Sequence, residues 1–591
     1  MVDPLLLVLA GVALYTLAAL ALKARGYLPP SVKVSGPITT LHTKRGRAFL
    51  DWLASPGRFW RAWGNFGVGI ALVVMAGMFI VVLQAGLTSV FDPQPATPVN
   101  EPQNVLVIPG VNDFLPLAAA PSIVLGLLVG LVVHEGGHGL LCRVEEIDID
   151  SMGLAFLAFV PVGAFVEPDE ESRRRADRGA QTRMFAAGVT NNFLVSLVGF
   201  LLLFGPITTA IVPVAGVPVG DTLSGSAANE TAMEFGDVVT AVDGQRVTSQ
   251  AEMDATLANT TDRQVTLGLE SGDSVTVDRY LIVTRAVPGA VPGIDLRGAE
   301  PPRVETVDGE AIYTEGGFRD QVREDPVVNL TTDRGSTEFV AGAYVARVAE
   351  DGAFADSEVP TDADRLVVTR VDGERVVSAE ALGTVLDQKT PGDEVTVEAY
   401  VDGERRTYEV TLGGSGEDAV LGVQLRRGVG GIVLEDTGVD AYPAGLFLDV
   451  LGGNVDLGGS GDFVRAIGLV LFLPFISALG GGIDYNFAGF NGPVQNFYTV
   501  QGPLSVLDGG AFVLANAVFW TAWVNIQLGL FNCVPSFPLD GGHILRTSTE
   551  SIVSRIPVGN RRALVSMTTT VVSLSMLAGL FLMIFGPRLF S

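Results

Sequence analysis

Two histidines and a glutamate stand inside one apolar run, LVVHEGGHGLLC at residues 131–142. His134 and His138 are four residues apart, so on a helix both imidazoles lie on the same face, one turn apart. This spacing allows two imidazoles to bind one Zn²⁺, and Glu135 between them can take a proton from an attacking water molecule. Ionisable side chains at membrane depth are costly and are usually functional. We therefore interpret the motif as a catalytic zinc site rather than as a polar surface helix.

A catalytic zinc ion has three protein ligands and one open position, so a third ligand must come from another part of the chain. The chain contains two further histidines, His42 in a basic loop and His543. His543 follows NCVPSFPLDGG, which begins at Asn532, and there two prolines and a glycine pair interrupt an apolar segment. Irregular backbone at membrane depth is tolerated where it is buried in protein or lines a wet cavity. Asp540 alone would be interpreted as a helix cap, but beside a motif that lacks one ligand we expect it to bind the metal.

The two cysteines, Cys142 and Cys533, are too few for a disulfide framework, and neither lies in a CxxC zinc pattern. Cys142 follows His138 by four residues and is an alternative fourth ligand. Because four protein ligands would leave no position for water, we interpret Cys142 as a small buried thiol.

The elements that must position these residues are membrane helices. The chain has 591 residues, of which 48% are hydrophobic, and its mean hydropathy of +0.40 is typical of an integral membrane protein. The N-terminal segment lacks a basic region ahead of its apolar run, so we expect a retained span rather than a signal peptide. Apolar segments long enough to cross a bilayer lie near residues 4–22, 66–88, 117–142, 184–213, 511–533 and 563–587, with a further candidate at 463–482.

The charge is strongly acidic and unevenly placed. The formal net charge is −27, and well over half of the 65 acidic residues lie between Asp221 and Asp462. Only four lysines occur in the chain. An acidic, lysine-poor exterior is typical of proteins kept soluble in high salt, so we expect a haloarchaeal source. Such a surface repels nucleic acid, which we exclude as a partner.

Charge also predicts the orientation of the spans. The loop between the first two spans has eight basic residues against one acid, which places this loop in the cytoplasm. The span with His134 then runs inward. Asp540 must reach the same depth, so the span at 511–533 must also run inward. This requires that 463–482 be re-entrant or lie at the surface, or that 483–510 contain a crossing.

Residues 214–440 are polar, glycine-rich and strand-like, with VTAVDGQRV and VTRVDGERV as hairpin signals. The VDG triplet at Val242 recurs at Val371, and GIDLR from Gly293 recurs as GVQLR from Gly422, both with an offset of 129 residues. One offset at both ends predicts a duplicated domain. An external location agrees with three Asn-x-Thr sequons, at Asn229, Asn259 and Asn329.

HEGGH in one membrane span and NCVPSFPLDGG in a later one resemble the motifs of the site-2 protease family, which are intramembrane zinc metalloproteases. The resemblance implies that Glu135 is the catalytic base and that His543 lies beside a ligand. It also implies that Asn532, eight residues before the aspartate, handles the substrate backbone. The zinc ligands that it implies are His134, His138 and Asp540.

Three further segments extend the resemblance. AAGVTNNFLVS (186–196) resembles the family's Gly-Pro-x-x-Asn stretch with Val189 at the usual proline position, so Asn191 or Asn192 is a candidate for substrate binding. GLAFLAFVPVGAFVEP (153–168) stands where the family has a membrane-embedded β-hairpin, to which an unwound substrate segment can add as a strand. The duplicated region resembles PDZ domains, which family members insert between the two catalytic halves on the extracytoplasmic side.

We therefore expect a polytopic α-helical protein of the cell membrane with an inserted extracytoplasmic pair of α+β PDZ-like domains. The expected function is hydrolysis of peptide bonds in transmembrane segments, with Zn²⁺ as cofactor and with membrane-anchored protein substrates and the lipid bilayer as partners. The expected parts are N-terminal helices and loops (1–116), a catalytic half with HEGGH (117–213), PDZ-like domain 1 (214–300), a linker with PDZ-like domain 2 (301–430), and a catalytic half with LDGG (431–591).

Two other functional classes are weaker alternatives. A catalytically inactive membrane scaffold with PDZ-like binding modules would be favoured by the loss of one of the four core residues, and all four are present. A metal transporter would need ionisable residues in further spans, and the spans at 66–88 and 184–213 contain none.

Overall fold

The computed structural model divides the chain into two compact units, one formed by Met1–Val212 with Gly445–Ser591 and the other by Pro213–Ala444. We describe each unit by itself. The structure describes residues 4–590 apart from positions 44, 102–103, 105–107, 113, 159, 299, 350–351, 358, 361–364, 417, 456–461, 480–482 and 558.

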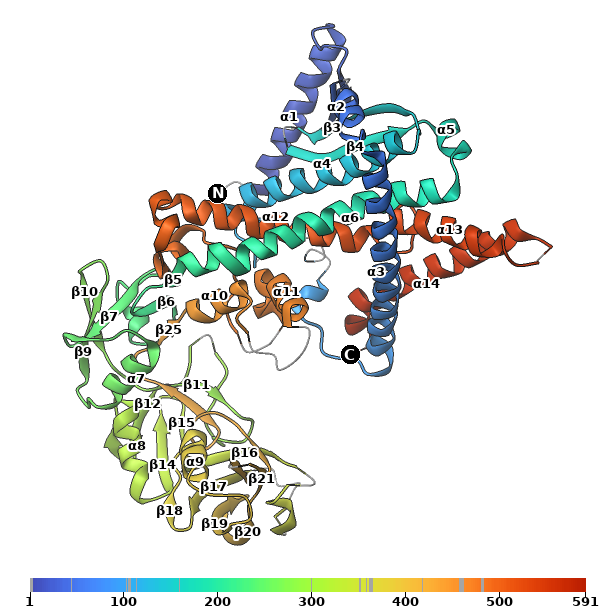
Figure 1. The fold of residues 1–591 in the computed structure, drawn as a ribbon. Coiled ribbons are helices and arrows are strands. Elements are labelled where there is room, and N and C mark those ends of the chain that lie inside the picture. Colours follow the sequence, from blue (N-terminus) through green and yellow to red (C-terminus); the bar gives the residue numbers. More distant parts are fainter. Residues whose placement is uncertain are drawn as a thin grey trace. The chain divides into compact units, whose positions relative to one another are not determined.

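The first unit is built from membrane-length helices (Figure 1). Its first helix, α1 (Pro4–Ala24), has side chains described from Ala10 onward. Five others are long and apolar enough to cross a bilayer, which confirms a polytopic membrane protein: α3 (Gly57–Phe91), α4 (Ala120–Val144), α6 (Arg178–Leu202), α12 (Gly510–Asn532) and α14 (Arg561–Phe590).

The ambiguous apolar segment at 463–482 contains only a short helix. This helix, α11 (Asp462–Phe472), has 11 residues. At 1.5 Å per residue it is about 16 Å long, roughly half the thickness of the hydrocarbon core. Between residues 473 and 509, the described residues form short 3₁₀ turns and one strand, β26 (Tyr498–Val500). The chain therefore reaches α12 without a further membrane-length helix in this described stretch, as the expected metal geometry requires.

Helices α4, α6 and α12 pack side by side and form the centre of this unit (Figure 1). Small residues allow the close approach: a Cβ atom at Gly126 would lie 2.7 Å from the carbonyl oxygen of Trp520, and one at Gly199 would lie 2.7 Å from the Cβ of Ala522. The Ser196 hydroxyl donates a hydrogen bond to the Ala522 carbonyl at 3.0 Å across the α6–α12 contact. Such small-residue contacts are the usual means by which helices associate in lipid.

A four-stranded antiparallel sheet lies against α4. The predicted hairpin is present as β3 (Ile149–Leu157) and β4 (Val160–Pro168). Two strands from the N-terminal segment extend it in the order β1-β2-β3-β4. These strands are β1 (Val32–Ser35) and β2 (Ile38–His42), and the short helix α2 (Arg45–Leu53) follows them. Strand β4 is thus one edge of the sheet, and the loop that sequence alone assigned to the cytoplasm carries part of it.

The second unit is rich in β-strands and contains three copies of one motif. Each copy has two strands, an Asp-Gly hairpin turn after the second, a short strand, a helix, two further strands and a last strand from later in the chain. The first copy comprises β6 (Val217–Thr222), β7 (Val238–Val242), β8 (Gln245–Arg246), α7 (Gln250–Ala258), β9 (Gln264–Leu269), β10 (Ser274–Asp278) and β25 (Val439–Ala441). The third comprises β16 (Ala343–Val348), β17 (Leu366–Val371), β18 (Glu374–Arg375), α9 (Ala379–Leu386), β19 (Glu394–Val401), β20 (Glu404–Thr411) and β23 (Val423–Leu425).

The middle copy lies where a linker was expected. It comprises β11 (Ile282–Ala286), β12 (Val304–Val307), β13 (Glu310–Ala311), α8 (Glu315–Glu324), β14 (Val327–Thr332), β15 (Gly335–Val340) and β24 (Ile432–Glu435). Its turn residue, Asp308, has a φ of 50°, beside 48° at Asp243 and 49° at Asp372. In each copy the aspartate carboxylate accepts a hydrogen bond from a backbone N–H of the strand after the helix, at Thr266, Asn329 and Thr396.

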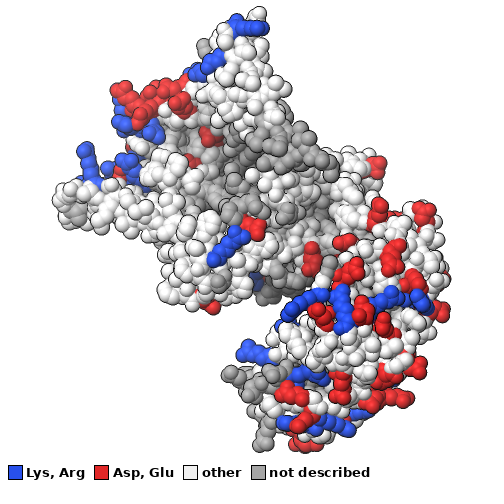
Figure 2. Space-filling model, turned by 180° about the vertical axis from the view of Figure 1, so that it is seen from behind, with Lys and Arg blue, Asp and Glu red and all other residues white. Residues whose placement is uncertain are grey.

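The three copies are nested. Strands β23, β24 and β25 return in that order and complete the third, second and first copies respectively. The third copy is therefore inserted in the second, and the second in the first. Figure 2 shows Asp and Glu side chains spread over the surface of this unit, in agreement with the acidic composition of the segment.

One half-buried glutamate in this unit predicts a pH dependence. Burial, with the neighbouring carboxylates of Glu315, Asp436 and Asp254, raises the pKa of Glu435 on β24 to about 8, from an ordinary value of 4.5. Between these two values the folded unit binds more protons than the unfolded chain, so its stability falls as the pH rises from about 4.5 to about 8.

Hydrogen exchange of the β24 amides in the full chain, corrected for intrinsic rates, measures this fall. Glu435→Gln should remove most of the dependence and leave the unit more stable at pH 8. Wild-type protection that is constant between pH 5 and pH 8 would contradict the prediction.

Candidate metal centre

Helix α4 carries both histidines of HEGGH into the interior of the first unit. Its first turn contains Pro121, and it continues to Val144. His134 and His138 are both buried, and their ring centroids are 4.7 Å apart in an edge-to-face arrangement. The four-residue spacing therefore places the two rings on one face of the helix, as expected from the sequence.

The side chain of Asp540, from the first turn of α13 (Asp540–Val553), meets these two rings. Its Oδ2 atom lies 3.0 Å from the Nε2 of His134 and 3.2 Å from the Nε2 of His138, and the two Nε2 atoms are 3.1 Å apart. These three residues form the only cluster of potential metal ligands found among the described residues. Cys142 and His543 do not belong to it.

The donor set fits a zinc ion. Two imidazole nitrogens and one carboxylate oxygen are ligands that zinc uses in catalytic sites. Their separations are slightly shorter than the roughly 3.3 Å between two ligand atoms that each lie about 2.0 Å from a tetrahedral zinc ion. The Oδ2 of Asp540 is buried, and within the described part of the chain it accepts no hydrogen bond of ordinary geometry. A cation between the three atoms would satisfy it.

Helix α6 fixes the orientation of the rings. The Nδ1 of His138 lies 2.8 Å from the backbone carbonyl oxygen of Met184, so its N–H donates to that carbonyl and its Nε2 presents a lone pair. Gly188, one turn further on, faces both rings. A Cβ atom there would lie 2.7 Å from the Nε2 of His138 and 2.9 Å from the Nδ1 of His134. The absence of a side chain at Gly188 is therefore what allows the two rings to pack against α6.

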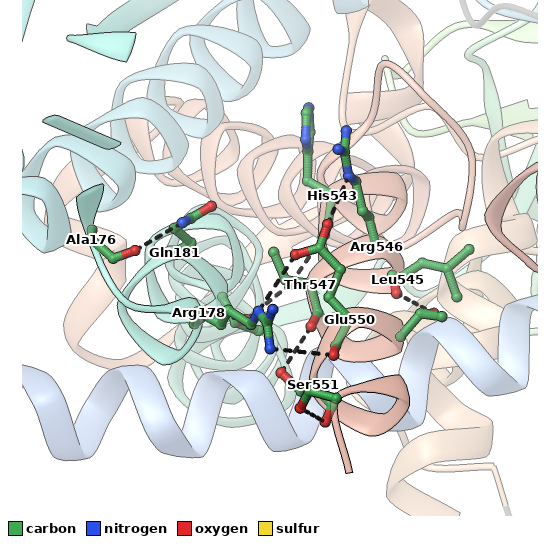
Figure 3. Close-up of polar contacts among 12 residues, drawn as sticks. Ala176, Arg178, Gln181, His543, Leu545, Arg546, Thr547, Glu550 and Ser551 are labelled. Carbon is green, nitrogen blue, oxygen red and sulfur yellow. Dashed lines mark hydrogen bonds and ion pairs between the residues drawn. The ribbon is translucent and has the colours of Figure 1, made fainter. Parts of the chain in front are cut away.

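Polar contacts join α13 to the start of α6 (Figure 3). The Glu550 carboxylate lies between Arg546, at 3.2 Å, and Arg178, at 3.6 Å. The Thr182 hydroxyl donates to that of Thr547 at 2.9 Å, and both are buried. These contacts join the helix that carries Asp540 to the helix that orients His138.

The Glu135 side chain contacts the hairpin. Its Oε2 accepts a hydrogen bond of 2.9 Å from the backbone N–H of Val166 on β4. Glu135 also lines a largely apolar cavity of about 730 Å³. Other residues of this cavity include Phe49, Leu53, Trp60, Trp63, Phe165 and Leu194. The proposed base therefore faces a space that suits apolar side chains.

The three predicted substrate-binding asparagines lie in different surroundings. Asn191 lines the cavity with Glu135 and accepts a hydrogen bond of 3.0 Å from the indole N–H of Trp63. Asn192 is fully buried. Asn532, at the end of α12, is half-buried, donates to the Leu528 carbonyl at 3.0 Å and does not line this cavity. Of the three, only Asn191 shares the cavity with the glutamate.

Sequence reasoning missed the contribution of the N-terminal segment to this cavity. Residues from Leu41 to Trp63, on β2, α2 and the start of α3, form one side of it. The aromatic sequence RFWRAW at 58–63 indicated only that this segment lies at the membrane interface, where tryptophan is enriched.

The chain is similar to one known protein family and to a protein from another organism. The family model for peptidase family M50 matches residues 122–577. A relative from Methanocaldococcus jannaschii, described as an uncharacterized protein, is 25% identical over 166 residues. This match includes 28% of the present chain and covers 42% of the length of that relative.

Proposed function

Because the chain belongs to peptidase family M50 and is a multi-pass membrane protein, we propose that it is a zinc metalloendopeptidase that cleaves membrane-anchored proteins within their transmembrane segments. One observation carries the proposal. The Nε2 atoms of His134 and His138 and the Oδ2 of Asp540 lie 3.0–3.2 Å from one another, and Glu135 is on the same helix as the two histidines.

Each residue of the site has a defined role in this proposal. A Zn²⁺ ion held by His134, His138 and Asp540 would polarise the scissile carbonyl and lower the pKa of a water molecule to about 7. Glu135 accepts the proton of the attacking water and passes it to the leaving amine. Met184 and Gly188 keep the histidine rings oriented from α6.

The edge of β4 is the proposed docking position for the substrate backbone. A transmembrane helix hides its carbonyl groups in its own hydrogen bonds, so it must unwind before hydrolysis. An unwound segment can add to the edge of a sheet, where the backbone supplies the hydrogen bonds. The Val166 N–H at this edge is held by Glu135 in the free protein. A substrate strand that takes this N–H brings its backbone beside Glu135 and releases the carboxylate for proton transfer.

The apolar cavity is the proposed binding site for side chains next to the scissile bond. Its aromatic and aliphatic lining suits residues such as leucine or phenylalanine, which transmembrane segments supply. Asn191, held by Trp63, is the polar group available there to a substrate amide.

Regulated proteolysis of a membrane-anchored substrate is the proposed biological context. The basic loop before α3 supports a cytoplasmic location for that end of the helix bundle, and the acidic β-rich insert would then lie outside. There its PDZ-like copies would restrict access to substrates that a first external cleavage has shortened. An inactive scaffold is less well supported, because the complete ligand set and the base are present.

Removal and return of the metal test the proposal. The full chain, purified in detergent, is expected to contain about one zinc ion per chain and to cleave a single-span model substrate. A chelator should abolish cleavage, and stoichiometric Zn²⁺ should restore it, because the ligand atoms are preformed by α4, α6 and α13. Absence of bound zinc in the wild type would contradict the metal site, and zinc without cleavage of any single-span substrate would favour the scaffold.

A further inference from the structure

Four buried polar atoms at the contact of α4, α6 and α12 lack a partner within the described part of the chain. They are the Nδ1 of His134, both side-chain polar atoms of Asn192 and the Oδ1 of Asn525. Asn192 and Asn525 are completely buried, and His134 is 6% exposed. Buried polar groups are nearly always hydrogen-bonded, and the cost of leaving them unpaired is greatest in a membrane interior.

Helix geometry places Asn192 beside the free nitrogen of His134. Gly188 faces His134, since a Cβ atom at Gly188 would lie 2.9 Å from the Nδ1. Asn192 follows Gly188 by four residues and so lies on the same face of α6, one turn further on. Helical side chains lean toward the N-terminus of their helix, which directs the Asn192 amide back toward the turn of Gly188.

Asn525, on α12, lies beside α4 one helical turn before His134. A Cβ atom at Gly130, one turn before His134 on α4, would lie 3.4 Å from both the Oδ1 and the Nδ2 of Asn525. The Nδ2 of Asn525 donates to the Thr521 carbonyl of its own helix at 2.8 Å, which leaves its Oδ1 to be satisfied. All four unpaired atoms therefore lie within about one helical turn of the metal ligands.

We propose that Asn192 and Asn525 hold one buried water molecule, and that this water accepts a hydrogen bond from the Nδ1–H of His134. This inference rests on the proposed metal site and assigns Asn192 and Asn525 as positioning residues for one of its ligands. His138 already has a carbonyl partner for its Nδ1, from Met184. His134 needs an equivalent acceptor, because a metal-binding imidazole almost always donates its other N–H.

The donors and acceptors match a water molecule and no simple ion. His134 Nδ1–H and Asn192 Nδ2–H are donors, while the Oδ1 atoms of Asn192 and Asn525 are acceptors. Water accepts two hydrogen bonds and donates two, so it satisfies all four groups. A cation would face two N–H groups, and an anion would face two carbonyl oxygens.

The test is the zinc affinity of the full chain, measured by competition with a chelator of known affinity. Asn192→Leu keeps the volume but removes the polar atoms, and it should weaken zinc binding by about 10–100-fold, the usual loss when such a supporting hydrogen bond is removed. Asn192→Asp keeps an acceptor in the same place and should bind zinc at least as tightly as the wild type. A role in packing alone predicts the reverse order, because a carboxylate is harder to bury than leucine.

Two further variants sharpen the comparison. Asn525→Leu should weaken zinc binding in the same direction as Asn192→Leu. Thr190→Val is the control, because Thr190 is also buried on α6, but its hydroxyl donates to the Ala186 carbonyl of its own helix. This variant should bind zinc as the wild type does.

The outcomes separate the inference from the proposed function. Equal zinc affinity in the wild type and Asn192→Leu, with cleavage by the wild type, overturns the buried water and leaves the peptidase intact. Weaker binding by Asn192→Asp also overturns it, including when Asn192→Leu fails to fold. A wild type that binds no zinc overturns both.

Discussion

Glu135→Gln should lower the rate of peptide hydrolysis by about 10²–10⁴-fold, the usual contribution of a general base, while zinc content stays near one ion per chain. Glutamine has the shape of glutamate, and its side-chain oxygen can still accept the Val166 N–H that Glu135 accepts at 2.9 Å. The change therefore removes proton transfer and leaves the ligands in place. Steady-state kinetics on a single-span substrate, with metal analysis of the same sample, measure both quantities.

A neighbouring carboxylate provides the control for this experiment. Glu167 follows Val166 on β4, and its carboxylate accepts a hydrogen bond from the Ser151 hydroxyl at 2.9 Å, away from the metal ligands. Glu167→Gln should therefore keep wild-type activity. Equal rates for Glu135→Gln and the wild type would exclude Glu135 as the base, and loss of zinc from Glu135→Gln would assign it to the metal site instead.

Gly188→Ala should abolish stable zinc binding and, with it, peptide hydrolysis. The added Cβ atom would lie 2.7 Å from His138 Nε2 and 2.9 Å from His134 Nδ1, closer than non-bonded atoms approach. At least one ring must move, and both belong to ligands on a helix that is packed against α6. Displacing a ligand should cost more than the about 10–100-fold loss in affinity that follows removal of a ligand's supporting hydrogen bond. Chelator competition measures this change.

Gly136→Ala is the matched control for Gly188→Ala. Gly136 lies between the two histidines of HEGGH, yet a Cβ atom there meets no atom within 4 Å. The same methyl group should therefore leave zinc affinity unchanged at Gly136 and destroy it at Gly188. Melting temperatures of both variants show whether they are folded. Normal zinc affinity in a folded Gly188→Ala would mean that the rings have room that the structure does not show.

The meeting of His134 with His138 could be predicted from the sequence because their spacing has local meaning. The four-residue step from His134 to His138 defines one helix face without knowledge of the fold. The assignment of Asp540 needed a second motif and the demand for a third ligand. The fold class followed from hydropathy, and the family match and the five apolar helices support it.

Features that depend on long-range packing were not available from the sequence. Asn191 and Asn192 are neighbours in the chain, but only the rotation of α6 decides that one faces the cavity and the other the interior. The cavity wall depends on the pairing of Leu41 with Leu154, which both line the cavity and are far apart in sequence. The middle copy of the insert was not predicted because the repeat of 129 residues matched only the first and third copies, whereas Asp308 stands 65 residues after Asp243 and 64 before Asp372.

The nested insert has a consequence for biosynthesis. The chain between His138 and Asp540 contains the whole insert, so 401 residues lie between two members of the candidate metal centre. At about 5–20 residues per second, a ribosome needs roughly 20–80 s to translate this interval. The copies can close only from the innermost outward, as β23, β24 and β25 emerge within residues 423–441. A nascent chain can therefore complete all three copies of the insert before Asp540, the third residue of the candidate metal centre, has been synthesised.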